Sequence, residues 1–403
     1  MKRWLAIVGI GEDGLRGLSG AARGVVENAE VVVGGQRHLA MCESSTAKKI
    51  SWPSPFSALV STLLAHRGDR VCVLATGDPF CYGVGSTLVR EIAIDEMWVY
   101  PSPSAFALAR ARLGWSAQDI SELSVHGRAF ANIELAIQPE HRFLVLSHDE
   151  TTPRAIAAKL VERGFGPSTV TVLEHLGGDA ERIRAQAAGA FSLDDIAPFN
   201  TVAVHCHAAP DASIRSTVPG LADDAFRSDG QLTKRMVRAV TVSALQPLPG
   251  QLLWDVGAGC GSVAIEWLRA APGTHAIAIE SRADRAELIR VNAASLGVPG
   301  LSIHCATAPE VLRSLPPPDA VFIGGGVTVD GVLDECMQAL RPGGRLVVNA
   351  VSLEGGAALV DAHRQWAGEL ATIATAHARP TGGFMGFVPA RPVTQWVYSK
   401  ALP

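Results

Sequence analysis

Charged residues are scarce in this sequence, and long hydrophobic runs are missing. Only 18% of the 403 residues are charged, and Gly, Arg, Asp or Pro interrupts every apolar stretch within a few residues. No run therefore approaches the ~18–20 consecutive apolar residues that span a bilayer. The net charge of −4 comes with lysines and arginines spread evenly, without the basic face that nucleic-acid phosphates require. We expect a soluble protein with a small-molecule substrate and neither a membrane nor a nucleic-acid partner.

Closely paired cysteines and a secretion signal are also missing. The seven cysteines are scattered, without the short spacings of zinc or redox sites, and we expect most of them to be small buried hydrophobes. The first apolar stretch, Leu5–Gly9, is too short for a signal-peptide core, which predicts a cytoplasmic protein. His205, Cys206 and His207 alternate between the two faces of a predicted strand, so the three cannot converge on one ion. We expect no metal site.

Hydrophobic residues make up 48% of the chain, which is enough for more than one core. A single core stops growing near ~250–300 residues, so two domains are expected. Short apolar runs alternate with helical stretches twice, as in two α/β domains, and a turn-rich segment without apolar periodicity separates the two series. The predicted division is a domain at 1–207, a linker at 208–230 and a domain at 231–403.

The predicted strands are almost continuously apolar, as in sheets that are covered on both faces. In the first half they are Trp4–Val8, Val31–Gly34, Val71–Ala75, Met97–Tyr100, Phe143–Ser147, Val170–Leu173 and Thr201–His205. In the second half they are Leu252–Val256, Ala276–Glu280, Leu301–His304, Ala320–Ile323, Arg345–Ala350, Ala371–His377 and Val393–Ser399. The last two lack a long helix between them, which predicts an antiparallel pair that closes a parallel sheet.

A glycine-rich turn joins the first strand of the second half to a helix predicted at Val263–Arg269. Such a turn presents backbone N–H groups and a helix N-terminus to an anionic group. Ser262 stands where a dinucleotide fingerprint has its third glycine, so NAD is disfavoured. Glu280 ends the next strand, where its carboxylate can accept hydrogen bonds from both ribose hydroxyls. The order of the glycine-rich turn and the strand-end acid along the sequence favours an adenosyl-cofactor site over a purely structural bend.

The segment Thr233–Ser399 resembles class I methyltransferases through its Asp-x-Gly-x-Gly-x-Gly loop at 255–261, the strand-end Glu280 and the turn Arg341–Arg345. Thr233–Ala239, Ala306–Glu310 and Val321–Gly326 are more closely similar to the decarboxylating precorrin methyltransferases. The resemblance implies a Rossmann-like seven-stranded fold. It also implies an activity that methylates carbon 15 of precorrin-6B and removes the carboxyl of the ring-C acetate. Implied S-adenosylmethionine contacts are Thr233, Asp255, Gly257, Ala258, Gly259, Cys260, Gly261, Glu280, Ala306 and Thr307.

A precorrin carries many carboxylates, and three cations stand shortly before the glycine loop. Lys234, Arg235 and Arg238 are substrate-binding candidates, and a solvated helix face is an equally good interpretation. Gly324, Gly325 and Gly326 permit close approach to a large flat ligand because they have no Cβ, although a plain flexible loop would look the same.

Strand-end glycine loops also occur at Val8–Gly14 and Ala75–Gly85, and a Pro-Ser-Pro-Ser-Ala segment follows the next strand. Together they resemble the tetrapyrrole methylases, class III methyltransferases that bind the cofactor between two α/β lobes. Cofactor contacts implied by this resemblance are Gly77, Asp78, Pro79, Phe80, Val84, Ser104 and Ala105, and Gly11 would border the substrate trough. The family usually has Pro-Gly-Asp where this chain has Glu12-Asp13-Gly14, whereas Leu173–Gly178 fits the corrin-specific branch.

Fusion of these two families in this order is similar to the bifunctional precorrin methyltransferases of cobalamin biosynthesis. That similarity implies two S-adenosylmethionine molecules per chain, methylation of a precorrin at carbons 5 and 15 with decarboxylation, and a homo-oligomer. No catalytic residue is assigned, because aligning the nucleophilic carbon with the methyl group can supply most of the catalysis. Two alternatives stay open: another small-molecule or RNA methyltransferase fused to an unrelated N-terminal module, and a non-catalytic sensor of adenosyl ligands.

Overall fold

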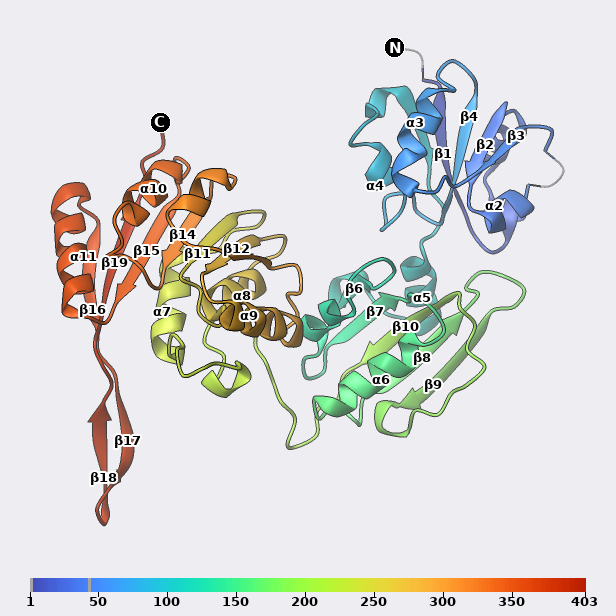
Figure 1. Cartoon of the computed structure of the whole chain (residues 1–403). Coiled ribbons are helices and arrows are strands. Elements are labelled where there is room, and N and C mark those ends of the chain that lie inside the picture. Colours follow the sequence, from blue (N-terminus) through green and yellow to red (C-terminus); the bar gives the residue numbers. More distant parts are fainter. Residues whose placement is uncertain (1–2, 43–44) are drawn as a thin grey trace. The chain divides into compact units, whose positions relative to one another are not determined.

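The computed structural model describes residues 3–42 and 45–403 (Figure 1). The chain forms two compact units. Unit 1 runs up to Arg128 and includes Ala136–Ile214, and unit 2 comprises Ala129–Leu135 and Arg215–Pro403. In the part of the chain that the structure describes, no helix is long and apolar enough to cross a membrane.

The first lobe of unit 1 is a parallel five-stranded sheet with the order β3-β2-β4-β1-β5. The central strands β1 and β4 are almost wholly buried and carry Val, Ile, Leu and Ala. The strands are β1 (Leu5–Ile10), β2 (Val31–Gly34), β3 (Lys48–Ser51), β4 (Val71–Thr76) and β5 (Met97–Tyr100). The helices are α1 (Gly20–Glu27), α2 (Gln36–Ala40), α3 (Leu59–Leu64) and α4 (Gly85–Leu88).

The second lobe of unit 1 is a mixed sheet with the order β6-β7-β10-β8-β9, in which only β6 and β7 run parallel. Its elements are α5 (Ala105–Leu113), β6 (Ile120–Ser124), β7 (Arg142–Leu146), α6 (Thr152–Glu162), β8 (Thr169–Glu174), β9 (Arg182–Ala187) and β10 (Asn200–His205). The sequence did not predict β3, β6 and β9. Each of them lies at the edge of a sheet and carries polar or charged residues, so a search for apolar runs misses it.

Unit 2 is a seven-stranded sheet with the order β13-β12-β11-β14-β15-β19-β16. Five strands are parallel, and β19 runs antiparallel to both of its neighbours, as predicted for a closing pair. The strands are β11 (Leu252–Val256), β12 (His275–Glu280), β13 (Ser302–Cys305), β14 (Ala320–Ile323), β15 (Arg345–Ala350), β16 (Glu369–Ile373) and β19 (Val393–Ser399). The helices are α7 (Arg235–Leu245), α8 (Ser262–Ala270), α9 (Ala283–Ser295), α10 (Val332–Ala339) and α11 (Leu353–Trp366).

The predicted strand Ala371–His377 is wrong in its extent. The chain leaves the sheet after Ile373 and forms a two-stranded ribbon of β17 (Ala376–Thr381) and β18 (Phe384–Pro389). The ribbon pairs only with itself and extends away from the sheet of unit 2 (Figure 1). Its proline and glycine residues, which suggested a loop, lie within or between the two strands.

The structure divides the chain differently from the predicted linker at 208–230. From Arg215 onward this segment belongs to unit 2, where Leu221 and Phe226 are buried in the core. The backbone N–H groups of Gly220 and Leu221 donate to the Glu266 carboxylate at 2.7 and 2.9 Å. The segment shows no apolar periodicity because it is anchored by isolated side chains and backbone hydrogen bonds, not by a regular element.

This anchoring predicts a large stability effect in the supposed linker. Replacing Phe226 by alanine should lower the unfolding free energy of unit 2 by about 3 kcal/mol, because the substitution empties a filled core position. Val218→Ala in the same segment is the matched control, because Val218 is 71% exposed, and it should change stability by no more than ~0.5 kcal/mol. Urea unfolding of the full chain provides the measurement. Equal midpoints for the two variants would mean that the segment is a loose linker after all.

Candidate functional site

In unit 2 a glycine turn joins β11 to a helix at the predicted place. Gly257, Gly259 and Gly261 all have positive φ angles, between 60° and 79°. The N–H groups of Gly257 and Ala258 both donate to the Ile279 carbonyl of β12. The loop is thereby fixed to the neighbouring strand, and the helix α8 begins at Ser262 directly after it.

Glu280 ties this loop to the end of β12. Its Oε2 accepts a hydrogen bond from Gly259 N–H at 2.9 Å, and its Oε1 accepts one from Arg282 N–H at 3.0 Å. Each carboxylate oxygen can accept more than one hydrogen bond, so both retain capacity for hydroxyl donors such as those of a ribose. A Cβ on Gly259 would find its nearest neighbour at 3.8 Å, which leaves space beside the loop. Glycine loop and carboxylate therefore suit an adenosyl ligand.

Asp255 supports the loop from inside the sheet. Its Oδ2 accepts a hydrogen bond from Ala264 N–H at 3.0 Å, while its buried Oδ1 has no hydrogen-bond partner among the described residues. Burial raises the pKa of Asp255 to about 7, and the nearby Glu280 carboxylate adds to the shift. The side chain thus anchors the start of α8, and its second oxygen is an unused acceptor in the protein interior.

The triple-glycine loop after β14 lies directly against the cofactor loop. A Cβ on Gly257 would be only 2.9–3.0 Å from the backbone of Gly325, so Gly257 cannot be replaced without displacing a loop. Gly324 N–H donates to the Val256 carbonyl at 2.9 Å, and all three glycines, 324 to 326, are exposed. The close backbone approach gives this loop a structural role in the site and leaves one face open.

The three candidate cations before the loop have different environments. Lys234 and Arg235 are exposed at the start of α7. Arg238 is fully buried: Nε donates to Glu266 at 2.8 Å, Nη1 to Asp223 at 3.2 Å, and the remaining donors bind the carbonyls of Thr233 and Leu221. The structure therefore does not support Arg238 as a substrate contact, because it holds the core of unit 2 together.

Ala306 and Thr307 follow β13 at the same edge of the sheet. The Ala306 N–H donates to the Glu280 carbonyl at 3.1 Å, so it is not available to an adenine. The Thr307 hydroxyl donates to Glu310 at 3.3 Å and is exposed. Cys260 is buried in the loop, and its carbonyl accepts a hydrogen bond from Asn292 at 3.0 Å.

In unit 1 the loops after β1, β4 and β5 converge. A Cβ on Gly9 would lie 1.8 Å from the Gly77 carbonyl oxygen, and one on Gly77 would lie 2.9 Å from the Pro103 carbonyl oxygen. Ser102 fixes the junction, because its N–H donates to Gly77 and its hydroxyl to the Gly9 carbonyl at 2.8 Å. The sequence predicted these loops separately, and the structure brings them into contact.

The predicted N-terminal contacts lie around this junction. The Asp78 carboxylate accepts Phe80 N–H at 2.8 Å, which forms a tight turn and leaves the Phe80 ring 41% exposed. The Ser104 hydroxyl caps α5 by accepting Ala107 N–H at 3.1 Å, so the helix N-terminus faces the loops. Pro79 is buried, and Ala105 and Val84 are half-buried at the starts of α5 and α4.

A polar cluster that the sequence did not predict joins the two lobes of unit 1. Glu12, in the loop after β1 beside Gly11, forms an ion pair with Arg37 and contacts Nδ1 of His175 at 2.8 Å. The Arg37 guanidinium stacks on the Phe199 ring, 4.1 Å from its centroid. The departure of Glu12 from the usual family pattern was the available signal, but its partner lies 163 residues away.

A second missed cluster lies at the opposite end of β10. His205 and His207 share a face, with ring centroids 4.2 Å apart, and Glu140 joins them so that one possible ligand atom from each residue lies within 4.8 Å of the others. The prediction of no metal ligands considered Cys206, which is buried elsewhere, and not Glu140. The Glu140 carboxylate lies 3.2 Å from His207 and 3.8 Å from His205, and these contacts account for the grouping without an ion.

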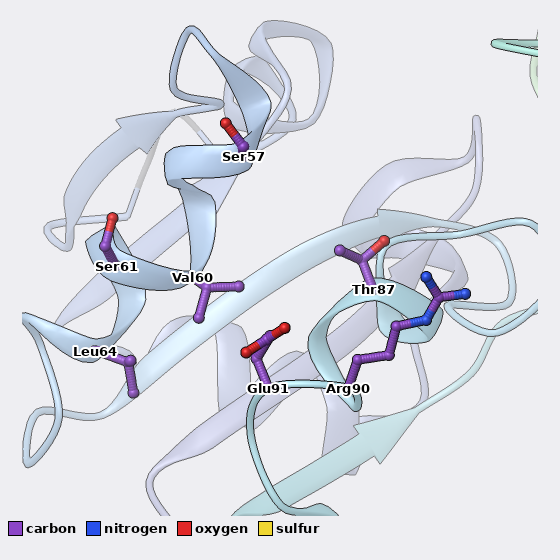
Figure 2. Close-up of a pocket in the computed structure, with 7 residues that line it drawn as sticks. All are labelled: Ser57, Val60, Ser61, Leu64, Thr87, Arg90 and Glu91. Carbon is purple, nitrogen blue, oxygen red and sulfur yellow. The ribbon is translucent and has the colours of Figure 1, made fainter. Parts of the chain in front are cut away.

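A surface pocket of unit 1 is separate from the strand-end loops of that unit. It is formed by side chains of α3 and α4 and the residues next to them (Figure 2), namely Ser57, Val60, Ser61, Leu64, Thr87, Arg90 and Glu91. None of the predicted contact residues lines it, so it carries no part of the candidate site.

The raised pKa of Asp255 predicts a pH dependence of stability. Because the folded-state pKa is about 7 and an unfolded aspartate titrates near ~3.9, the contribution of Asp255 is present below pH ~4 and is lost as the pH rises toward 7. Asp255→Asn cannot ionise, so its unfolding free energy relative to the wild type should rise by about 1.4 kcal/mol per pH unit between pH 5 and 7.

Denaturant unfolding of the ligand-free full chain at pH 5, 6 and 7 measures this difference. Asp284→Asn is the control, because the exposed Asp284 has its pKa lowered by the hydrogen bond from Arg282. Its difference from the wild type should not grow over this range. An equally flat difference for Asp255→Asn would show that Asp255 is ionised throughout.

Comparison with known proteins agrees with this geometry in both units. Residues 224–400 match the family "Precorrin methyltransferase domain", and residues 5–190 match "Tetrapyrrole (Corrin/Porphyrin) Methylases". These matches and the sheet orders confirm the predicted fold class, a two-lobed class III methyltransferase fold followed by a seven-stranded class I fold. Among solved structures, the C-terminal domain of precorrin-6Y C5,15-methyltransferase from Rhodobacter capsulatus is 44% identical, with a TM-score of 0.44, and covers 46% of this chain and 100% of that chain.

Two curated relatives match across both units. The precorrin-6Y C(5,15)-methyltransferase [decarboxylating] of a Sinorhizobium species is 47% identical over 98% of this chain and 96% of its own length. The protein of the same name from Mycobacterium tuberculosis (strain CDC 1551 / Oshkosh) is 41% identical over 98% of this chain and 100% of its own length. On this evidence the chain belongs to the family of decarboxylating precorrin-6Y C(5,15)-methyltransferases.

Proposed function

We propose that this protein methylates a precorrin at carbons 5 and 15 and removes the carboxyl group of the ring-C acetate, converting precorrin-6B to precorrin-8X in cobalamin biosynthesis. The observation that carries the proposal is the presence of two separate strand-end loop sites on two differently built sheets. Each site lies in the unit whose family methylates tetrapyrroles or precorrins. A methyltransferase with an unrelated N-terminal module, or a sensor, would not require this pairing.

We assign one S-adenosylmethionine molecule to each unit. In unit 2 the glycine loop and the Glu280 carboxylate suit an adenosyl group, and the hydrogen bonds of Glu280 and Asp255 fix the loop and the start of α8. In unit 1 the turn at Asp78 and the N-terminus of α5 frame the junction of the three loops. Lys234 and Arg235 are the proposed contacts to substrate carboxylates in unit 2, and Gly11 and Gly324–Gly326 are proposed to lie beside the macrocycle.

In the proposed reaction the residues of the chain position the cofactor and the macrocycle and exclude water from them. When bound, S-adenosylmethionine would supply the methyl group, which passes in line to a macrocycle carbon as its bond to sulfur breaks. Glu280 would orient the ribose, and the contact of Gly257 with Gly325 sets how closely the two loops can hold the reactants. Loss of carbon dioxide leaves an electron pair that the conjugated macrocycle delocalises, and a dry, closely packed cleft favours that step.

The proposal is tested with precorrin-6B, S-adenosylmethionine and the full chain. Mass and NMR analysis should show a product with two additional methyl groups and one fewer carboxyl. Titration calorimetry should give two cofactor sites per chain. Retention of all carboxyls would exclude the decarboxylating reaction, and a single cofactor site in folded protein would exclude the two-site proposal.

Glu280→Gln should separate the two reactions. The amide nitrogen cannot accept hydrogen bonds, so cofactor binding in unit 2 should weaken by ~1–3 kcal/mol, and carbon-15 methylation should fall at limiting cofactor. The unit 1 site should keep its affinity, and a product methylated only at carbon 5 should appear if that unit accepts unprocessed substrate. Glu287→Gln on the exposed face of α9 is the matched control and should behave as the wild type. Loss of binding at both sites by a folded Glu280→Gln variant would contradict two independent sites.

The ribbon β17–β18 supports the proposal that the protein is a homo-oligomer. Phe384 is 83% exposed and Phe387 is 80% exposed, and they lie on opposite faces of the ribbon because side chains alternate along a strand. A lone two-stranded ribbon is marginally stable in water. A second copy of the chain offers the same apolar ribbon in a self-complementary arrangement. We therefore propose that the ribbon packs against its equivalent in another copy.

Sedimentation of the Phe384→Asp/Phe387→Asp double variant tests this contact. The wild type should sediment as an oligomer and the variant as a monomer with both cofactor sites intact, because the ribbon lies outside the glycine loops. Leu353→Asp on α11 is the control, since Leu353 is 89% exposed but not in the ribbon. A monomeric wild type at micromolar concentration, or an unchanged variant, would contradict the contact.

We also propose that the protein works in the cytoplasm. All seven cysteines are free thiols, which suits a reducing compartment.

A further inference from the structure

We propose that Glu12 and His175 act as a proton-accepting pair in the methyl transfer of unit 1, with His175 as the base and Glu12 as its positioning residue. The inference rests on the proposed function. Glu12 follows β1 in the first lobe, and His175 follows β8 in the second lobe. Their contact, 2.8 Å between Glu12 Oε2 and His175 Nδ1, therefore joins the strand-end loops of the two lobes.

The surroundings of Glu12 fix how the histidine is protonated. Arg37 forms an ion pair with the other oxygen of Glu12, and the Glu12 side chain is only 13% exposed. A carboxylate held in this way accepts a hydrogen bond from Nδ1–H of the histidine, so the neutral ring bears its lone pair on Nε2. Nε2 of His175 has no hydrogen-bond partner among the described residues, and a third of the side chain is exposed. The free nitrogen is thus available to a ligand.

The loop that carries His175 adopts a conformation that requires support. His175 has a φ of +49°, in the left-handed region that histidine seldom occupies. Gly178 allows the loop to close on Glu12, because a Cβ at this position would be 2.7 Å from Glu12 Cβ. Strained non-glycine residues of this kind cluster at functional sites, where the surrounding structure holds them in place.

The two methylations differ in their net proton balance, because only the methylation at carbon 5 releases a proton that an external base must accept. At carbon 15, departure of carbon dioxide leaves its bonding electron pair in the macrocycle, which compensates for the positive charge that arrives with the methyl group. At carbon 5 no carboxyl departs. The new C–CH3 bond forms as the S–CH3 bond breaks, and the methine carbon then carries both a hydrogen and a methyl group.

Conjugation at carbon 5 is restored when the C–H bond breaks and its electron pair returns to the macrocycle. The proton passes to His175 Nε2, Glu12 stabilises the resulting imidazolium, and water later removes the proton. The reaction that lacks a departing carboxyl belongs to the unit that holds the Glu12–His175 pair. The reaction that releases a proton is thus assigned to the unit that contains a possible proton acceptor, and this coincidence is the main support for the proposal.

Few other titratable groups face His175 with a free charge. Glu181, whose carboxylate binds Gly177 N–H in the same loop, is paired with Arg112. Glu174, the residue before His175, is paired with Arg182 and Arg184. His38, behind Arg37, is neutral at physiological pH, because burial lowers its pKa to about 4. Asp179, further along the loop, is paired with Arg16. Glu12 is therefore the carboxylate that stabilises a positive charge on the His175 ring.

Product analysis of the full chain with precorrin-6B and S-adenosylmethionine tests the pair. His175→Gln should lower the rate of carbon-5 methylation at least ~100-fold, as loss of a general base does, while carbon-15 methylation, decarboxylation and cofactor binding stay unchanged. Imidazole in the buffer should restore part of the rate in His175→Ala. Glu12→Gln removes the negative charge beside the ring and should move the inflection of the carbon-5 pH–rate profile to lower pH.

The pair His66 and Asp69 is the matched control, since it is also a histidine Nδ1 and carboxylate at 2.9 Å but lies outside the strand-end loops. His66→Gln should leave both methylations unchanged. If His175→Gln methylates carbon 5 at the wild-type rate, or if it loses cofactor binding and imidazole restores nothing, the base assignment is overturned. If the wild type itself does not methylate carbon 5, the proposed function fails, and the inference fails with it.

Discussion

Both candidate sites depend on two stretches of backbone that approach each other too closely for any side chain to fit between them. In unit 1 the approach joins Gly9 to Gly77, and in unit 2 it joins Gly257 to Gly325. The two sheets have unrelated strand orders, so the common feature is not inherited from one topology. It follows from the position of the loops at the carboxyl ends of adjacent parallel strands, where neighbouring loops meet. Backbone donors are thereby gathered at one place, and carboxylates such as Glu280 hold them in position.

The elements of the fold and of the candidate sites were predictable where a short stretch of sequence carried their pattern. Buried strands such as β1 and β11, the glycine loop at 257–261 and the strand-end Glu280 were all predicted, because each is a short pattern with a direct structural meaning. The edge strands β3, β6 and β9 were missed because they carry polar or charged residues, whereas the more apolar edge strand β5 was predicted. The ribbon β17–β18 was missed because proline and glycine usually indicate loops, whereas here they occur in a two-stranded element outside the main sheet.

Contacts between residues that are far apart in the sequence could not be predicted from such local patterns. Nothing near Glu12 indicates His175, and nothing near Arg238 indicates that Glu266 lies beneath it. Arg238 was a candidate substrate contact, with a solvated helix face as the equal alternative, because a precorrin carries many carboxylates and this cation stands shortly before the cofactor loop. The structure instead places it among Glu266, Asp223 and two backbone carbonyls, which compensate its charge in the interior. Sequence position alone cannot distinguish a surface cation from a paired buried one.

The buried pair of Arg238 and Glu266 has a consequence for how substrate is recognised. The same helix, α7, presents Lys234 and Arg235 to solvent at its first turn and buries Arg238 one turn later. Rotation or sliding of α7 would leave two charges unpaired in the interior, which is energetically costly. The exposed cations Lys234 and Arg235 therefore lie on a helix that has one favourable position against the sheet of unit 2. Under the proposal that Lys234 and Arg235 bind substrate carboxylates, this recognition should follow lock-and-key behaviour, with the ordering cost of the helix met during folding and not at each encounter with substrate.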